Sequence, residues 1–109
     1  MYYRIVNSHR SSHQPIMKKI EIIFPKHELD QVTNLLQKNQ IPGYTIIEVY
    51  SGYGKYHGTS LELGFSSSQS LLYLFAVDTA ENIDALVPKI QGTINEIGAL
   101  LISYAVQVH

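Results

Sequence analysis

The change in hydrophobic period along the chain is the feature that most constrains its fold. From Met17 onward, Ile20, Ile22 and Phe24 alternate with polar neighbours, which predicts a half-buried strand that ends at Pro25. The period then becomes helical. The next apolar residues fall on one face of an amphipathic helix: Leu29, Val32, Leu35 and Leu36.

The strand and helix periods then recur. After a turn at Pro42-Gly43, a β-branched run from about Tyr44 to Ser51 predicts the second strand. The Gly- and Ser-rich span from Gly52 to Ser70 follows, within which Thr59 to Phe65 has strand character. The run from Leu71 to Val77 has little polarity on either side, which predicts a central strand.

A second helix and a last strand complete the pattern. Asp78 to Glu81 has the composition of a helix N-terminal cap, in which the carboxylate of Glu81 reaches back toward the backbone three residues earlier. Pro88 predicts a kink near Leu86 or an early stop, because proline removes a backbone donor. The last strand is expected from about Leu100 to Val108. The core-facing stripe of the helix has steps of four and three: Ile83, Val87, Ile90, Ile94 and Ile97.

These elements predict an α+β, ferredoxin-like β-α-β-β-α-β fold, an antiparallel four-stranded sheet with two helices on one face. The other face is left uncovered. The strands Leu71 to Val77 and Leu100 to Val106 carry apolar residues at both odd and even positions, and therefore on both faces of the sheet. A monomer would expose a larger apolar patch than soluble monomers tolerate. We therefore expect a homo-oligomer.

Composition limits the partners and the compartment. The 109 residues suffice for one domain, expected over residues 17–109, with residues 1–16 as a flexible N-terminal extension. The net charge of -1 and scattered cations give no reason to expect nucleic acid binding. The absence of cysteine excludes disulfides and thiolate metal sites. The apolar runs are far shorter than the roughly 20 residues of a membrane span, so we expect a cytoplasmic protein without direct membrane insertion.

One segment has the composition of an anion site. The second strand leads into Gly52-Tyr53-Gly54-Lys55, which brings backbone amides and a cation together at a strand end. Two simpler interpretations remain open. The glycines are equally compatible with a bulge or a sharp bend, and Lys55 is compatible with an ordinary solvated loop cation.

The sequence resembles the PII signalling proteins. The resemblance covers nearly the whole predicted domain and rests on these segments: Met17-Lys18-Lys19-Ile20-Glu21, Leu29-Asp30-Gln31-Val32, Gly43-Tyr44-Thr45, Glu48-Val49 and Gly52-Tyr53-Gly54-Lys55. It implies a homotrimer whose open sheet faces meet at the centre. It also implies that small effectors, usually adenine nucleotides, bind in clefts between subunits.

By this resemblance, the candidate ligand-binding residues are Thr45, Gly52, Gly54, Lys55 and Gly98. The family further implies a regulator that is not an enzyme, acts in nitrogen regulation, and requires no cofactor. Its target would be a membrane transporter or a metabolic enzyme. The loop after the second strand would contact that target, with Tyr56, His57, Gly58 and Glu62 as the candidate contact residues.

The chain departs from the family pattern before and within its last strand. Asn95 to Ala99 stands where PII proteins have a phosphate-closing loop with Asp and Lys, and only Gly98 matches. The segment Leu100 to His109 contains no arginine. The chain thus resembles the divergent PII-like group, for which ATP, ADP, AMP or cyclic AMP are candidate effectors. The alternative is a CutA-like trimer without a nucleotide site, which either responds to metal or is purely structural. The sequence itself does not identify a set of metal-ligating residues.

Overall fold

The computed structural model describes residues 14–51, 54–56, 59–61 and 70–109. Its main sheet has four strands in the order β2-β5-β1-β6. Every neighbouring pair in this sheet is antiparallel. The strands are β1 (Met17–Pro25), β2 (Thr45–Glu48), β5 (Leu71–Thr79) and β6 (Leu100–Val106). A separate two-stranded sheet pairs β3 (Gly54–Tyr56) with β4 (Thr59–Leu61).

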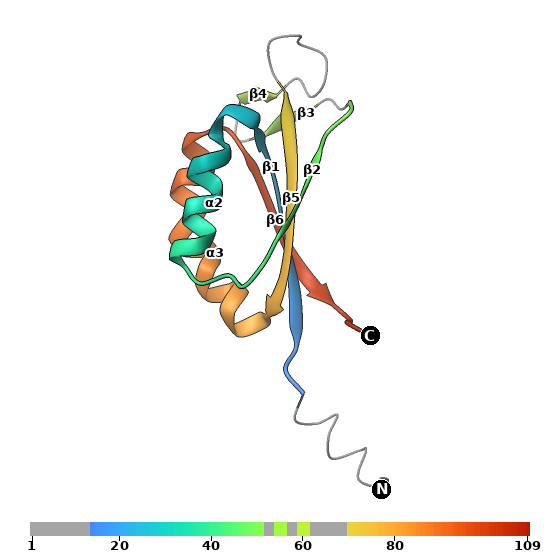
Figure 1. Ribbon diagram of the computed structural model, residues 1–109. Coiled ribbons are helices and arrows are strands. Elements are labelled where there is room, and N and C mark those ends of the chain that lie inside the picture. The colour runs from blue at the N-terminus through green and yellow to red at the C-terminus, as the bar shows by residue number, and fades with distance from the viewer. Residues whose placement is uncertain (1–13, 52–53, 57–58, 62–69) are drawn as a thin grey trace, which may run out of the picture.

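Two helices cover one face of the main sheet, as Figure 1 shows. They are α2 (Leu29–Lys38), which follows a short 3-10 turn η1 (Lys26–Glu28), and α3 (Ala80–Glu96). The predicted β-α-β-β-α-β ferredoxin-like fold is therefore confirmed. The prediction of Leu71 to Val77 as a central strand is also confirmed, because β5 lies between β2 and β1.

The core lies between the sheet and the helices. Alternate residues of β1 and β5 point into it and meet one apolar stripe from each helix, as the periodicity predicts. No polar or charged residue of the described ranges is buried. The residues of this core that are fully or almost fully buried are Ile20, Ile22, Phe24, Val32, Leu36, Leu72, Leu74, Ala76, Ile83, Leu86, Ile90, Ile94 and Ala99. Leu71 is also buried, but outside this core, where Ile23 and Val49 pack against it.

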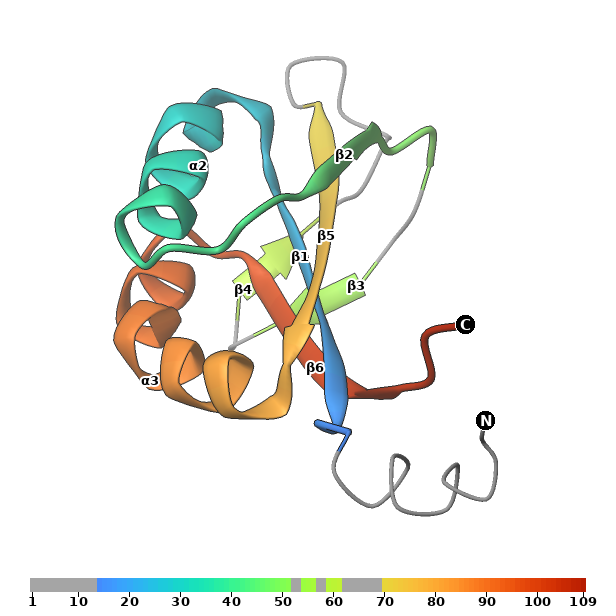
Figure 2. The same ribbon diagram turned by 60° about the horizontal axis from the view of Figure 1, so that its bottom comes forward.

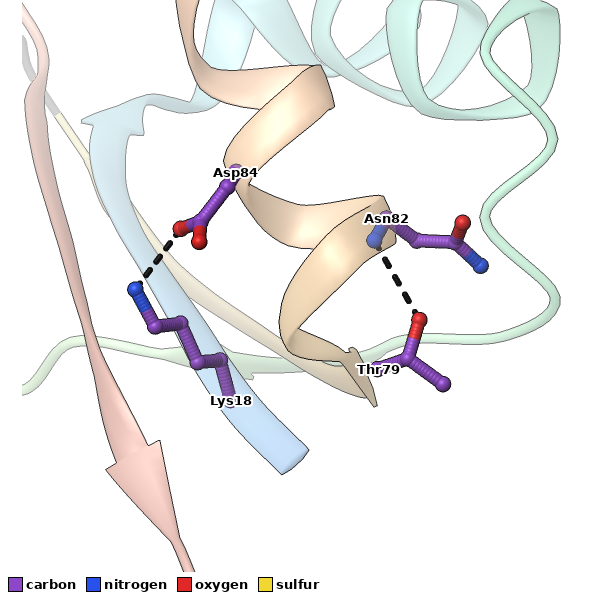
Figure 3. A network of polar contacts seen from close by, with 4 residues as sticks. All are labelled: Lys18, Thr79, Asn82 and Asp84. Atoms are coloured by element: carbon purple, nitrogen blue, oxygen red, sulfur yellow. Dashed lines mark hydrogen bonds and ion pairs between the residues drawn. The ribbon is translucent and has the colours of Figure 1, made fainter. Parts of the chain in front are cut away.

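Helix α3 corrects two predictions. It runs through Pro88 to Glu96, so of the two predicted alternatives, a kink near Leu86 or an early stop, the early stop is wrong. Ile90 and Ile94, which follow the proline, are fully buried, and this packing holds the helix together despite the lost backbone hydrogen bond. Within the predicted cap segment Asp78 to Glu81, the N-cap is Thr79, and the cap bond is made by a hydroxyl and not by a carboxylate: the hydroxyl of Thr79 accepts a hydrogen bond from the backbone N–H of Asn82 at 3.2 Å (Figure 3).

The edge strands are shorter than predicted. Strand β2 ends at Glu48 and not at Ser51, although Val49 still donates its backbone N–H to the carbonyl of Leu71 at 3.0 Å. Strand β6 ends at Val106 and not at Val108. Figure 2 shows both outer strands with the rest of the sheet between them. Outer strands pair on one side only, which leaves their boundaries less constrained by pattern alone.

Candidate functional site

Thr45 opens β2 and lies opposite Phe75 of β5. Its neighbour Ile46 packs against the core, so Thr45 and Ile47 point to the uncovered face of the main sheet, hereafter the open face. Thr45 is exposed there. A ligand that contacted this hydroxyl would have to approach from the open face or from the β2 edge.

Three of the predicted residues lie in the small two-stranded sheet. Gly54 pairs with Leu61 and Lys55 with Ser60. Tyr56 ends β3 opposite Thr59. The other candidate residues of this segment lie outside the described residues: Gly52, His57, Gly58 and Glu62. The strand character expected at Thr59 to Phe65 is therefore present at least in Thr59 to Leu61.

The base of this segment is tied to the end of the main sheet. Ser70, which precedes β5, accepts a backbone hydrogen bond from Lys26 at 2.8 Å. The ammonium group of Lys26 lies 3.3 Å from a carboxylate oxygen of Glu48, the last residue of β2. Sequence reasoning named Lys55 as the cation of the candidate site and did not include Lys26, whose proximity to the end of β2 arises only because β1 and β2 both pair with β5.

Gly98 has a structural role in ending α3. Its φ of 73° is left-handed, and the backbone N–H groups of Gly98 and Ala99 donate to the carbonyls of Asn95 and Ile94. This is the Schellman pattern of a helix C-terminus. An added Cβ would meet nothing within 4 Å, so the glycine answers a conformational need and not a spatial one. Its role in ligand binding stays a prediction.

Thr45 and Gly98 lie at opposite edges of the sheet. Thr45 belongs to β2, and Gly98 immediately precedes β6. These two strands are the outer strands of the order β2-β5-β1-β6, and three strand spacings separate them by roughly 14 Å. One chain therefore does not bring these two predicted residues into one small site. A site that used both would need the β2 edge of one copy beside the β6 edge of another.

The open face carries a polar cluster that sequence reasoning missed. One carboxylate oxygen of Glu21 on β1 accepts hydrogen bonds from the hydroxyls of Tyr73 on β5 and Tyr104 on β6, each at 2.7 Å. The ammonium group of Lys19 lies 3.3 Å from the same oxygen and 4.6 Å from the ring centroid of Phe75. We call Lys19, Glu21, Tyr73 and Tyr104 the open-face cluster.

These contacts shift the pKa values of the cluster. Hydrogen bonds from Tyr104 and then Tyr73 lower the pKa of the Glu21 carboxyl, since they stabilise its charged form. The hydrogen bond to Glu21 raises the pKa of Tyr104, whereas burial is the main cause that raises the pKa of Tyr73. The pKa of Lys19 is raised, first through Tyr73. The cluster therefore holds one anion, one cation and two neutral phenols at neutral pH.

A cavity of about 200 Å³ lies elsewhere, where the end of α2 approaches the start of α3. Asn39, Asp78, Asn82 and Lys89 contribute polar groups to its wall, and Leu86 contributes an apolar one. None of the predicted ligand residues lines it. Asp78 and Asn82 also hydrogen-bond to each other at 3.2 Å, so part of this polar wall is already satisfied within the chain.

Within the described ranges, no group of three or more His, Cys, Asp or Glu residues is placed to hold a metal ion. His27 is accompanied only by Glu28, at 3.4 Å. Neither helix of the described chain combines the length and the apolar character that a membrane span requires.

Comparison with known proteins adds a family match. The family model of nitrogen regulatory protein P-II matches residues 17–108. No curated protein matches the sequence.

Solved structures share the fold. The structure of CPII from Thiomonas intermedia K12 bound to ADP and bicarbonate has 27% sequence identity and a TM-score of 0.67, covering 85% of this chain and 88% of that chain. The same protein bound to ADP, AMP and acetate gives 24% identity and a TM-score of 0.69, over 87% and 90% of the two chains. A candidate PII-like signalling protein from Thermus thermophilus gives 14% identity and a TM-score of 0.65, over 86% and 90%.

Proposed function

Since this chain belongs to the nitrogen regulatory P-II family, we propose that it is a PII-like regulator that binds an adenine nucleotide between subunits and thereby controls a partner protein. The observation that carries the proposal is the family match over residues 17–108, which spans every strand and helix of the main fold. The nucleotides bound to CPII support the choice of ligand class.

The geometry of the main sheet supports a site between subunits. Thr45 and Gly98 belong to opposite edges of one chain, and a homotrimer is the assembly that this family forms. In such an assembly the β2 edge of one copy approaches the β6 edge of the next, and the segment that begins with Gly52-Tyr53-Gly54-Lys55 lies beside the ligand. We assign Thr45, Gly52, Gly54, Lys55 and Gly98 to nucleotide binding on this basis.

The proposed output is a change in the segment from Tyr56 to Ser70. Nucleotide bound at its base favours one conformational population of this segment, which then contacts a transporter or a metabolic enzyme through Tyr56, His57, Gly58 and Glu62. The protein acts in the cytoplasm by binding and does not catalyse a reaction. Weak affinity for a triphosphate is expected, because few cations are available to neutralise it.

Isothermal titration calorimetry with ATP, ADP, AMP and cyclic AMP tests the ligand. We expect heat and thermal stabilisation with at least one of them, and the Lys55→Ala variant should weaken that response while its oligomeric mass stays unchanged. Lys38→Ala, a lysine in the last turn of α2, is the matched control and should bind as the wild type does. No heat and no stabilisation with any of the four nucleotides would contradict the proposal.

A further inference from the structure

The open-face cluster occupies the middle of the uncovered sheet. Glu21 lies on β1, an inner strand, and receives its hydroxyl donors from the strands on both sides, β5 and β6. Apolar side chains surround the cluster on the same face. Ile47 on β2 is 52% exposed and Ile102 on β6 is 41% exposed. The open face is therefore an apolar surface with one organised polar centre.

The members of the cluster satisfy one another within a single chain. The two hydroxyl contacts at 2.7 Å are in the range of charge-assisted hydrogen bonds, which are the stronger class. Lys19 supplies the counter-charge at 3.3 Å, and the Glu21 side chain is already only 19% exposed. The face can thus be covered by another surface without leaving an isolated charge, which would be costly.

The charge of this surface indicates what covers it. The cation of Lys19 and the anion of Glu21 cancel, so the described residues of the open face offer no net charge to attract nucleic acid, an anionic lipid surface or a strongly charged peptide. A second copy of the same chain is neutral in the same way and brings the same apolar surround. Two copies of the face neither repel each other nor leave either charge unpaired.

A polar centre also restricts how such faces fit together. If one copy shifted along the other, the cluster would meet Ile47 or Ile102 of its neighbour, and its polar groups would be desolvated against apolar side chains. A single polar position in an apolar contact is a known means of selecting one register and one stoichiometry.

We propose that Glu21, held by Tyr73, Tyr104 and Lys19, is the specificity-determining residue of self-association: second copies of this chain cover the open face, and the open-face cluster selects one arrangement among them. This inference rests on the proposed homo-oligomer and adds the residue that defines it. It separates two roles, since the apolar side chains drive association and Glu21 decides its geometry.

Sedimentation velocity and light scattering on four proteins test the proposal. The wild type should form one species. Glu21→Ala leaves Lys19 without its counter-charge and should raise the dissociation constant at least about tenfold. The apolar combination Lys19→Met, Glu21→Leu, Tyr73→Phe and Tyr104→Phe should still associate, but into several masses. Lys18→Met is the matched control, because the adjacent Lys18 pairs with Asp84 on the helix-covered side, and it should behave as the wild type does (Figure 3).

Circular dichroism and thermal melting establish that each variant is folded. If Glu21→Ala fails to fold, the double variant Tyr73→Phe and Tyr104→Phe keeps the rings, removes both donors, and should weaken association in the same direction. A wild type that stays monomeric would contradict the proposed oligomer itself. An oligomeric wild type whose stoichiometry and affinity are unchanged in the Glu21→Ala, double and fourfold variants would overturn the role of Glu21 alone.

Discussion

The two faces of the main sheet are built from alternate residues of the same strands but follow different rules. On β1, Ile20, Ile22 and Phe24 point to the helices and are fully buried. Lys19 and Glu21 point to the open face, where they pair with each other and Glu21 accepts hydrogen bonds from two tyrosines. The first face is a purely apolar core in which shape and volume determine stability. The second face carries a fixed polar pattern, which contributes less to stability and more to the choice of arrangement.

Replacing one isoleucine on each face with alanine should give the largest difference in the free energy of unfolding. Ile22→Ala empties a site that is fully buried and should lower the free energy of unfolding by about 2–5 kcal/mol. Ile102→Ala removes a side chain that is 41% exposed and should cost about 1 kcal/mol or less at low protein concentration. Urea denaturation measures both values.

Protein concentration sharpens this first test. If copies of the chain cover the open face, the cost of Ile102→Ala should grow as the protein concentration rises, while that of Ile22→Ala should change little. Equal costs for the two variants at low concentration would mean that the faces do not differ in the way described.

A pair of threonines gives the next largest effect. Thr79→Ala removes the N-cap of α3, the helix that covers one face, and should cost about 1 kcal/mol in urea denaturation. Thr45→Ala alters an exposed position of the open face and should change stability by only a few tenths of a kcal/mol. Calorimetry should show the reverse order for nucleotide binding, with Thr45→Ala the weaker binder. A Thr79→Ala variant as stable as the wild type would argue against the cap.

Acidification should reveal the open-face cluster. The pKa of Glu21 is lowered from 4.5 in the folded chain, first by Tyr104 and then by Tyr73. A carboxyl with a lowered folded pKa contributes stability above its unfolded pKa and loses that contribution as the pH falls through the folded value. The melting temperature of the wild type should therefore fall more steeply than that of Glu21→Gln between about pH 6 and about pH 3.

The tyrosines provide the internal control for the pH experiment. Tyr104→Phe removes the leading cause of the shift and should give a pH dependence between those of the wild type and Glu21→Gln. Parallel melting curves for all three proteins over this pH range would show that the hydrogen bonds to Glu21 do not stabilise its charged form.

The smallest effect is expected from the ion pair on the helix-covered side. Lys18 and Asp84 lie 2.7 Å apart with side chains that are 27% and 57% exposed. Pairs of this kind contribute about 0.2–1 kcal/mol and are screened by salt. Lys18→Met should therefore lower stability by that amount in low salt, and the difference should shrink in 1 M salt, roughly the concentration at which screening is nearly complete. If the stability difference between the wild type and Lys18→Met is as large in high salt as in low salt, packing of the aliphatic part of the Lys18 side chain, and not the ion pair, is its cause.

Local patterns in the sequence predicted most of the fold. The alternation around Ile22 and the stripe from Ile83 to Ile94 are local signals, and both lead to the observed elements. Boundaries depended on competing effects. Proline chemistry favoured a kink near Leu86 or an early stop, but the helix continues to Glu96 with Ile90 and Ile94 buried. Likewise, α2 ends at Lys38, before the expected Pro42-Gly43 turn, because Gln40 adopts a left-handed φ of 63°.

The candidate site was harder to predict, because it depends on register between distant strands. Tyr73 lies 52 residues from Glu21 and Tyr104 lies 83 residues from it, so no sequence window contains the open-face cluster. The signal that was available was the polar pair Lys19 and Glu21 facing away from the helices on a strand with neighbours on both sides. The assignments of Thr45, Gly52, Gly54, Lys55 and Gly98 to a ligand rest on family resemblance and remain predictions.

The placement of Thr45 and Gly98 on opposite outer strands has a consequence for any metabolite that contacts both. Such a molecule would act as a bridge between chains, so its apparent affinity would rise with the abundance of the protein and fall on dilution. Conversely, the metabolite would hold the chains together when the protein is scarce. The cellular dose of the protein would then set the threshold at which it responds.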